Sequence, residues 1–385
     1  MSHKKRNTSS SITHRLLIYS FYSSNGIDTG YRYYFLSKVR DIFDQILVVV
    51  NGDIENNTKE KISEVSDEII IRENRGFDAC AYQYVLRDVL HYELSKYEEL
   101  FLVNDTFYGP FFDLKDVIHE AESKNADLWG MTFYKKDPNS VSGEVQYSHI
   151  QSYFLAFRYT IFSKSVFSSF WNNVGCFSNV ADVIKNYESV LTHYFADNMG
   201  AKYWTYMQEL TINFNIGKNP YLTHPYDLIE NKFPFLKKKA ITPEYIGDPE
   251  QSYKVVANID KLNYPTKLIF DEIVNEYQNP YSGWLYDFSK LREKINNKRI
   301  IVYGAGKIGK ILGYYFILNN IKEFKYLVTD GENTDNNIMT LSDYKYQKGD
   351  VVIIAVMRKT IAKIMYDNIK DRVPVEQIIF PQCDQ

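Results

Sequence analysis

Short hydrophobic runs alternate with helical patterns over residues 15–242. Runs of four to six apolar residues rich in Ile and Val occur within 15–22, 45–52 and 68–76, and segments with helical periodicity separate them. Buried runs of this length are typical of parallel strands that are joined by right-handed crossovers. The pattern therefore predicts an α/β domain built on a mostly parallel sheet.

The same alternation continues beyond residue 76. Further strands are predicted at 99–110, 127–134, 149–162 and 201–207. Helices are predicted at 31–43, 77–92, 114–123 and 182–200. Gly200 stands where a left-handed C-terminal cap is expected to end the last of these helices.

A second, smaller α/β pattern follows near the C-terminus. KRIIVYGAGKIGKILGYYFILNN (298–320) has the order strand, glycine turn, helix, and three more hydrophobic runs come after it. We therefore divide the chain into four parts. These are a flexible tail (1–14), an α/β domain (15–242), a mainly helical connecting segment (243–296) and a small Rossmann-like half-domain (297–385).

Charge and hydropathy exclude two classes of protein. The 385 residues include 45 Lys+Arg and 48 Asp+Glu, a formal net charge of −3, so no overall basicity is available for binding nucleic acid. The longest clean apolar run, Ile46–Val50, is far shorter than the ~20 residues that span a bilayer. We expect a cytoplasmic protein, and peripheral contact with the inner face of the cell membrane stays open.

The three cysteines indicate a reducing compartment. Cys80, Cys176 and Cys383 are far apart and form no CxxC pair. This spacing predicts neither a disulfide framework nor a thiolate zinc site.

The first candidate site is the turn ENRGFD (73–78), which joins a strand to a helix. Ligands of open α/β sheets bind beyond the carboxyl ends of the strands, and a helix N-terminus offers free N–H groups to an anion. Gly76 permits close backbone approach, Arg75 is a phosphate-binding candidate, and Asp78 is a hydrogen-bond acceptor for a base or ribose. The alternative is that Asp78 is an ordinary helix N-cap.

The second candidate site lies at the end of the strand 99–110, in LVNDTFYGP. Asn104 and Asp105 offer oxygen ligands, which Mg²⁺ and Mn²⁺ prefer, and a bound diphosphate completes such a shell. The alternative is an Asx turn that leads into Gly109–Pro110.

Three isolated side chains complete the candidates in the first domain. Glu188 lies early in the helix 182–200, where a carboxylate near the edge of the sheet could take a proton from an acceptor hydroxyl. The alternative is a solvated surface residue. His149 and His224 are the other two, and isolated histidines usually have a structural role.

The C-terminal unit contains a dinucleotide fingerprint. Gly304, Gly306 and Gly309 follow a strand and open a helix, and Asp330 closes the next strand. This arrangement can cradle the phosphates of NAD or another nucleotide, with the acid on a ribose. Close packing between strand and helix is the alternative.

Several blocks, in order, resemble the rhamnan synthesis protein F family of bacterial polysaccharide glycosyltransferases. The blocks are RENRGFDACAY, ELFLVNDTFYGP, DLWGMTFY, HIQSYFLAFR, FW, YESVLT and NKFPFLKK, between about Leu16 and Ile241. The resemblance implies a GT-A-like, inverting transferase that uses a nucleotide-sugar donor. The expected donor is dTDP-L-rhamnose, for assembly of cell-wall or capsular polysaccharide. The resemblance does not extend to the small C-terminal unit.

The resemblance also implies roles for single residues. The ENRG turn falls where such enzymes hold the nucleotide, and Glu188 falls where inverting members carry the general base. Asp105 with Asn104 stands at the Asp-x-Asp metal motif, with one carboxylate where the family pattern has two. His224 falls at a late metal ligand. Tyr108 and His149 are candidates for contacts with donor or acceptor.

Two other function classes rest on the C-terminal fingerprint. The chain could be an NAD-dependent oxidoreductase or a nucleotide-sugar epimerase, or the unit could be an assembly or sensing module without chemistry. For the glycosyltransferase, the expected partners are the donor and a glycan or lipid-linked glycan acceptor. Whether the chain forms a homo-oligomer stays open.

Overall fold

The computed structural model describes most of the chain in separate stretches. These are residues 14–140, 143, 145–241, 255–256, 258–278, 288–306, 308–309, 312–313, 316, 321, 323–331, 337–356 and 358–380. The predicted tail, apart from His14, lies outside the described residues, and so does Cys383.

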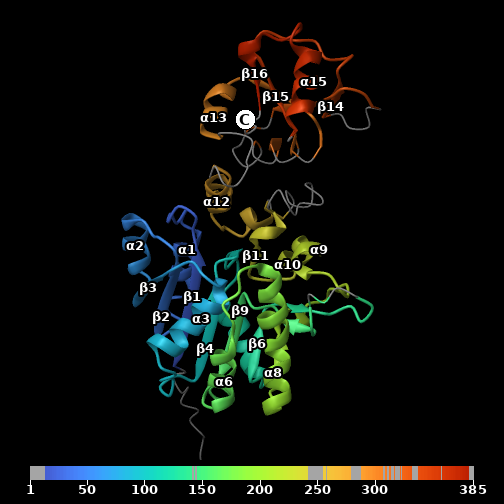
Figure 1. Ribbon diagram of the computed structural model, residues 1–385. Helices are drawn as coiled ribbons and strands as arrows, with labels where there is room; N and C mark the ends of the chain where they lie inside the picture. The colour runs from blue at the N-terminus through green and yellow to red at the C-terminus, as the bar shows by residue number, and fades with distance from the viewer. Residues whose placement is uncertain are drawn as a thin grey trace, which may run out of the picture. The chain divides into compact units, whose positions relative to one another are not determined.

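The chain separates into two compact units. One comprises the chain up to Asp28 together with Arg32–Phe235, and the other comprises Thr29–Tyr31 and everything from Leu236 onward (Figure 1). No helix among the described residues is long and apolar enough to cross a membrane.

The first unit is built on a seven-stranded sheet in the order β10-β6-β9-β4-β1-β2-β3. Its strands are β1 (Arg15–Tyr22), β2 (Gln45–Asn51), β3 (Glu68–Arg72), β4 (Glu99–Asn104), β6 (Leu128–Gly130), β9 (Phe154–Arg158) and β10 (Tyr203–Thr205). All neighbours pair in parallel except β9, which runs antiparallel to both β4 and β6. The expected α/β class with a mostly parallel sheet is confirmed.

Helices cover both faces of this sheet. They are α1 (Tyr31–Val39), α2 (Asn56–Ser63), α3 (Phe77–Tyr84), α4 (Leu114–Ser123), α5 (Tyr159–Phe162), α6 (Ser165–Asn173), α7 (Val180–Val183), α8 (Ser189–Met199), α9 (Pro220–Thr223) and α10 (Pro225–Glu230). π-Helical turns at Val85–Val89 and Ile184–Glu188 extend α3 and join α7 to α8, and a 3₁₀ turn follows β10 at Tyr206–Glu209. Gly200 ends α8 at φ +64°, as predicted.

Alternating side chains of the strands form two cores. On one face, Leu17 and Tyr19 pack with apolar residues of α1 and α4. On the other face, Leu16 and Ile18 pack with α3, α6 and α8, which lie in front of the sheet in Figure 1. This double cover explains why the strands are continuous hydrophobic runs.

The strand predicted over 149–162 is wrong at both ends. The chain instead forms β8 (His149–Ile150), which pairs with β7 (Phe133–Tyr134), and then β9 and helix α5. The pairing of β9 stops at Arg158, opposite Glu99, the first residue of β4. With no further partner strand, the chain continues as a helix.

The structure also corrects the cysteine argument. Cys80 in α3 and Cys176 form a disulfide across a sequence separation of 96 residues. Sequence spacing could not show this pair, because only the packing of α3 beside the loop after α6 brings the two residues together.

The second unit has a five-stranded sheet in the order β14-β13-β12-β15-β16, in which every pair is parallel. Its strands are β12 (Arg299–Tyr303), β13 (Phe324–Val328), β14 (Ile338–Thr340), β15 (Asp350–Ile354) and β16 (Ile378–Ile379). Its helical elements include α12 (Lys267–Gln278), α13 (Phe288–Ile295), α15 (Lys359–Ile369), and 3₁₀ turns at Lys238–Ala240 and Val375–Gln377. The short strand β11 (Leu236–Lys237) opens this unit.

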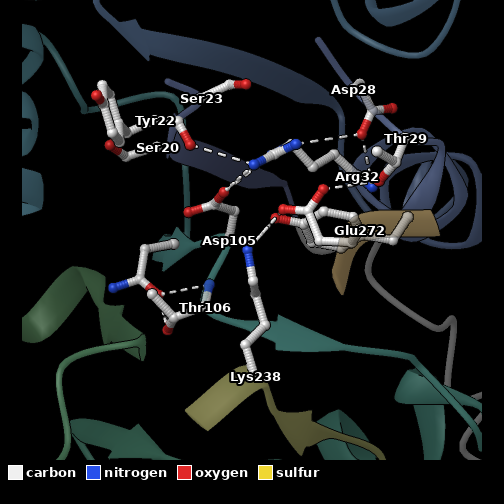
Figure 2. Close-up of polar contacts among 12 residues, drawn as sticks. Ser20, Tyr22, Ser23, Asp28, Thr29, Arg32, Asp105, Thr106, Lys238 and Glu272 are labelled. Carbon is white, nitrogen blue, oxygen red and sulfur yellow. Dashed lines mark hydrogen bonds and ion pairs between the residues drawn. The ribbon is translucent and has the colours of Figure 1, made fainter. Parts of the chain in front are cut away.

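Helix α12 is anchored within this unit by a buried carboxylate. Glu272 accepts hydrogen bonds from Thr29 Oγ1 at 2.8 Å and from Lys238 Nζ at 2.7 Å (Figure 2). The side chain of Glu272 is 2% exposed, so this carboxylate depends on both donors.

Candidate functional site

The polar residues at the end of β4 form the centre of the candidate site. The Asn104 side chain donates from Nδ2 to Asp78 Oδ2 at 2.7 Å. Its Oδ1 accepts from the backbone N–H and the hydroxyl of Thr106, at 3.2 and 2.5 Å. The structure therefore shows the Asx turn at Asn104, and it also joins the ENRGFD turn to the end of β4.

Asp105 is held by a buried arginine from α1. Arg32 Nε and Nη2 both lie 2.8 Å from Asp105 Oδ2, and Nη1 lies 3.5 Å from Asp28 Oδ1 (Figure 2). The guanidinium also donates to the carbonyl of Tyr22 at 3.2 Å. Its side chain is 2% exposed, so the positive charge is compensated inside the protein.

Sequence reasoning missed Arg32 because a charged residue on a surface helix is expected to face solvent. The available signal was its position, three residues before Phe35 and four before Leu36, on the face of α1 that packs against the sheet.

Glu188 reaches the same edge of the sheet. It ends the π-helical turn before α8, and its Oε1 accepts the backbone N–H of Ser152 at 2.8 Å. The next residue, Tyr153, accepts the backbone N–H of Asn104 at 3.1 Å through its carbonyl. Since β9 runs antiparallel to β4, the start of β9 lies beside the end of β4, and this places Glu188 on the side of the molecule that holds Asn104 and Asp105.

Two buried tyrosines pack beneath these carboxylates. Tyr82 of α3 and Tyr187 of the π-helical turn are fully buried. Burial raises the pKa of both phenols well above the ordinary value, and the negative charge of Asp78 adds to the effect. Among the described residues neither hydroxyl has a hydrogen-bond partner. Both side chains therefore stay neutral and fill space below the site.

The ENRGFD turn has a left-handed glycine at its centre. Gly76, at φ +73°, is the N-cap of α3, so the alternative role of Asp78 as the cap is not what the structure shows. Arg75 is exposed. Behind the turn, Arg72 donates to the Arg75 carbonyl at 3.0 Å and to Asn51 Oδ1 at 2.5 Å.

Arg72 and Asn51 are further site residues that the sequence analysis missed. The signal was available, because each is the polar last residue of a hydrophobic strand, β3 and β2. Partial burial behind the turn lowers the pKa of Arg72.

The other predicted residues of the first unit occupy enclosed positions. His149 is 2% exposed, its Nδ1 lies 2.8 Å from the Tyr147 carbonyl oxygen, and its ring stacks on Tyr134. Tyr108 is buried in β5 (Phe107–Tyr108). A role for His149 or Tyr108 in donor or acceptor binding stays a prediction.

The ligands of a resident metal do not gather at this edge. Within the described parts of the chain, no group of three or more His, Cys, Asp or Glu side chains is placed to hold a metal ion. His224 pairs through Nδ1 with Asp227 Oδ2 at 3.1 Å, and its Nε2 is buried without a hydrogen-bond partner among the described residues, so its role as a metal ligand stays a prediction. One oxygen of Asp105 already carries two N–H contacts from Arg32.

In the second unit, the fingerprint glycines have different surroundings. Gly304 has φ +115°, and a Cβ there would lie 2.7 Å from the Ala355 carbonyl oxygen. A Cβ on Gly309 would lie 1.7 Å from the Gly304 oxygen, whereas one on Gly306 would meet nothing within 4 Å. Close packing therefore explains why Gly304 and Gly309 are glycines. It does not explain Gly306 or the exposed Asp330, and nucleotide binding by this unit stays a prediction.

These features define a mixed α/β protein whose polar and acidic residues meet where its parallel strands end. The sequence model of the family "Rhamnan synthesis protein F" matches residues 46–373, and the chain belongs to this family. The resemblance seen in the sequence is confirmed, and its expected limit at Ile241 is wrong, because the match extends through most of the second unit.

One curated relative is similar over part of its length. The protein y4gN of Sinorhizobium fredii, which carries no assigned activity, is 29% identical over 150 residues, 39% of this chain and 38% of the relative. The chain thus spans about two fifths of the relative that it matches.

The solved structures that match this chain are distant in sequence. Core-mannan synthase A from Aspergillus fumigatus, in its Mn/GDP form, is 10% identical, with 49% of this chain and 70% of that chain covered and a TM-score of 0.29. The mannosyltransferase PcManGT from Pyrobaculum calidifontis, in complex with GDP-Man and Mn²⁺, is 12% identical, with 71% and 72% covered and a TM-score of 0.32. Residues 1–349 of TarS from S. aureus are 10% identical, with 74% and 78% covered and a TM-score of 0.33.

Proposed function

We propose that this chain is a GT-A-like, inverting glycosyltransferase that transfers rhamnose from dTDP-L-rhamnose to a growing cell-wall or capsular polysaccharide. Membership of the rhamnan synthesis protein F family supports the substrate class. The observation that carries the proposal is the set of contacts around the end of β4, which bring Asp78 and Asn104 together and place Glu188 on the same edge.

We assign the donor to the ENRGFD turn and the N-terminus of α3. The positive end of the α3 helix dipole and the exposed Arg75 favour an anionic diphosphate. Gly76 gives the turn its left-handed backbone, and Asp78, which Asn104 orients, is the acceptor for a ribose or base group.

Glu188 is the residue that we assign as general base. In the transfer, the acceptor hydroxyl oxygen bonds to the anomeric carbon as the bond from that carbon to the diphosphate oxygen breaks, and the electron pair leaves with the diphosphate. The hydroxyl proton passes to Glu188. The N–H of Ser152 fixes Oε1, which leaves Oε2 as the atom for the proton. The acceptor is the hydroxyl of a glycan or a lipid-linked glycan.

A panel of sugar nucleotides tests the donor assignment directly. A ligand at about a hundred times its dissociation constant adds roughly 2.7 kcal/mol to the free energy of unfolding, which thermal denaturation resolves. We expect dTDP-L-rhamnose to stabilise the full chain more than dTDP alone or other sugar nucleotides, and to be hydrolysed slowly without acceptor. Stabilisation by no sugar nucleotide would overturn the proposal.

Glu188→Gln tests the general base. Because the amide oxygen of Gln can accept the Ser152 N–H, we expect an intact fold and a donor affinity within a factor of about two, while turnover falls by about 10²–10⁴-fold. Glu122→Gln is the matched control, since the carboxylate of that partly exposed residue pairs with Arg15 and His119. Similar turnover in both variants would remove Glu188 from this role.

A further inference from the structure

The arginine that holds Asp105 changes what the end of β4 can bind. The family resemblance implies a divalent cation at Asp105, brought or completed by the donor diphosphate. In the structure, Asp105 Oδ2 instead receives both Nε and Nη2 of Arg32 at 2.8 Å. The positive charge beside this carboxylate is thus the guanidinium of Arg32, a side chain of the protein itself.

Several other oxygen atoms at this edge already accept hydrogen bonds. Asn104 Oδ1 accepts from Thr106, Asp78 Oδ2 accepts from Asn104, and Glu188 Oε1 accepts from Ser152. A divalent ion held between a protein and a diphosphate takes one or two protein carboxylates as ligands, and Asp105 is the carboxylate that the resemblance assigns to it. These side chains therefore form a hydrogen-bonded set rather than a coordination shell.

Arg32 cannot leave this position at low cost. Its side chain is 2% exposed, its guanidinium also contacts Asp28 and two backbone carbonyls, and its Cζ lies 5.0 Å from the centre of the Phe21 ring. A divalent ion on Asp105 would stand close to this buried positive charge, and moving the arginine would leave that charge uncompensated.

We propose that Arg32 is a positioning residue that withdraws Asp105 from metal binding, so that this protein binds its nucleoside diphosphate donor and transfers the sugar without a divalent cation. The inference rests on the proposed function, because it concerns the same donor. The positive charge for the leaving diphosphate then comes from Arg75 and the positive end of the α3 helix dipole.

The test uses the full chain and two kinds of probe. Mn²⁺ alone is titrated and followed by the loss of the electron paramagnetic resonance signal of the free ion. The affinities for dTDP, UDP and GDP, and the turnover of the best donor, are measured with EDTA and with added Mn²⁺. We expect no stoichiometric Mn²⁺ site, and affinity and turnover that differ by less than about twofold between the two conditions.

Arg32→Gln should change the metal response, which a purely structural role would not. With the guanidinium removed, Asp105 Oδ2 loses the N–H donors of Arg32, and we expect Mn²⁺ to raise the nucleotide affinity of this variant by about tenfold or more, or ~1.4 kcal/mol. Arg40→Gln is the matched control, because its ion pair with Asp67 is on the surface, with side chains 36% and 40% exposed.

The outcomes separate the two proposals. Nucleotide binding and turnover that collapse in EDTA and return with Mn²⁺ would overturn the metal-free inference while supporting the transferase. An equal metal response of the wild type, Arg32→Gln and Arg40→Gln would overturn the role of Arg32. If the wild type binds no nucleotide under either condition, the proposed function fails. If Arg32→Gln does not fold, the wild-type Mn²⁺ titration and the EDTA comparison still decide the inference.

Discussion

The turn that we assign to the donor depends on a glycine packed against a disulfide, and Gly76→Ala is the sharpest way to perturb it. Gly76 adopts φ +73° at the start of α3. An added Cβ would lie 2.4 Å from Cys80 Sγ and 2.8 Å from Cys176 Sγ. The bridge holds both sulfur atoms in place, so the turn itself has to move.

Two separate effects set the magnitude of this change. A residue with a Cβ in the left-handed region costs about 1–2 kcal/mol. Forcing an extra methyl group into a well-packed site costs a further ~1–3 kcal/mol. We therefore expect Gly76→Ala to lower the free energy of unfolding of the first unit by about 2–5 kcal/mol in total.

The assay is urea denaturation of the full chain, followed by Trp fluorescence, together with nucleotide affinity. Gly200→Ala is the matched control, because Gly200 has φ +64° but a Cβ there would meet nothing within 4 Å. It should show only the backbone cost and leave nucleotide affinity unchanged, whereas Gly76→Ala should weaken nucleotide binding by about tenfold or more. Equal destabilisation by the two variants would refute the role of the disulfide contact.

Two further predictions concern buried polar groups. Burial raises the pKa of Asp350, but hydrogen bonds from Arg299 and neighbouring donors outweigh this effect and hold the pKa below its ordinary value. The ionised carboxylate therefore stabilises the folded state fully above the unfolded pKa of about 3.9, and this stabilisation is lost as the pH falls through the folded pKa. Asp350→Asn should thus lower the free energy of unfolding of the second unit by about 1.5–3 kcal/mol at neutral pH, and the difference from wild type should be smaller in acid. The control is Asp367→Asn, in an exposed pair, which should leave the urea midpoint almost unchanged. An equal loss of stability in both variants would contradict this prediction. Tyr82→Phe should be nearly neutral in the same assay, because the Tyr82 hydroxyl has no hydrogen-bond partner within the described residues, whereas Tyr153→Phe, which removes the acceptor of a 3.1 Å bond, should cost about 1 kcal/mol. A large loss from Tyr82→Phe would show that its hydroxyl is bonded.

Local patterns predicted the regular elements of the first unit well. The helix expected at 114–123 and the strand expected at 15–22 have those bounds in the structure. Both carry a strong local signal, since Asp113 caps the helix through its side chain and the strand is a mostly apolar run. The edge position of Asn104 also followed from sequence, because it is the last residue of a hydrophobic strand.

The remaining features depend on contacts between distant segments, which periodicity does not report. The antiparallel direction of β9, the disulfide between Cys80 and Cys176 and the burial of Arg32 all arise from packing in three dimensions. The second unit shows the same limit, because the spacing of Gly304 and Gly309 is the same whether they serve packing or a ligand.

The reversed direction of β9 has a consequence for how substrate choice could change. The parallel strands end at this edge of the sheet, whereas β9 begins there. Residues such as Ser152, which precede β9 in the chain, therefore lie at the same edge as the ends of the parallel strands. Insertions or exchanges before β9 could therefore reshape the neighbourhood of Glu188 without disturbing β1–β4. A directed-evolution library for new acceptors would accordingly be best placed in the segment just before β9, with the ENRGFD turn and β1–β4 left unchanged.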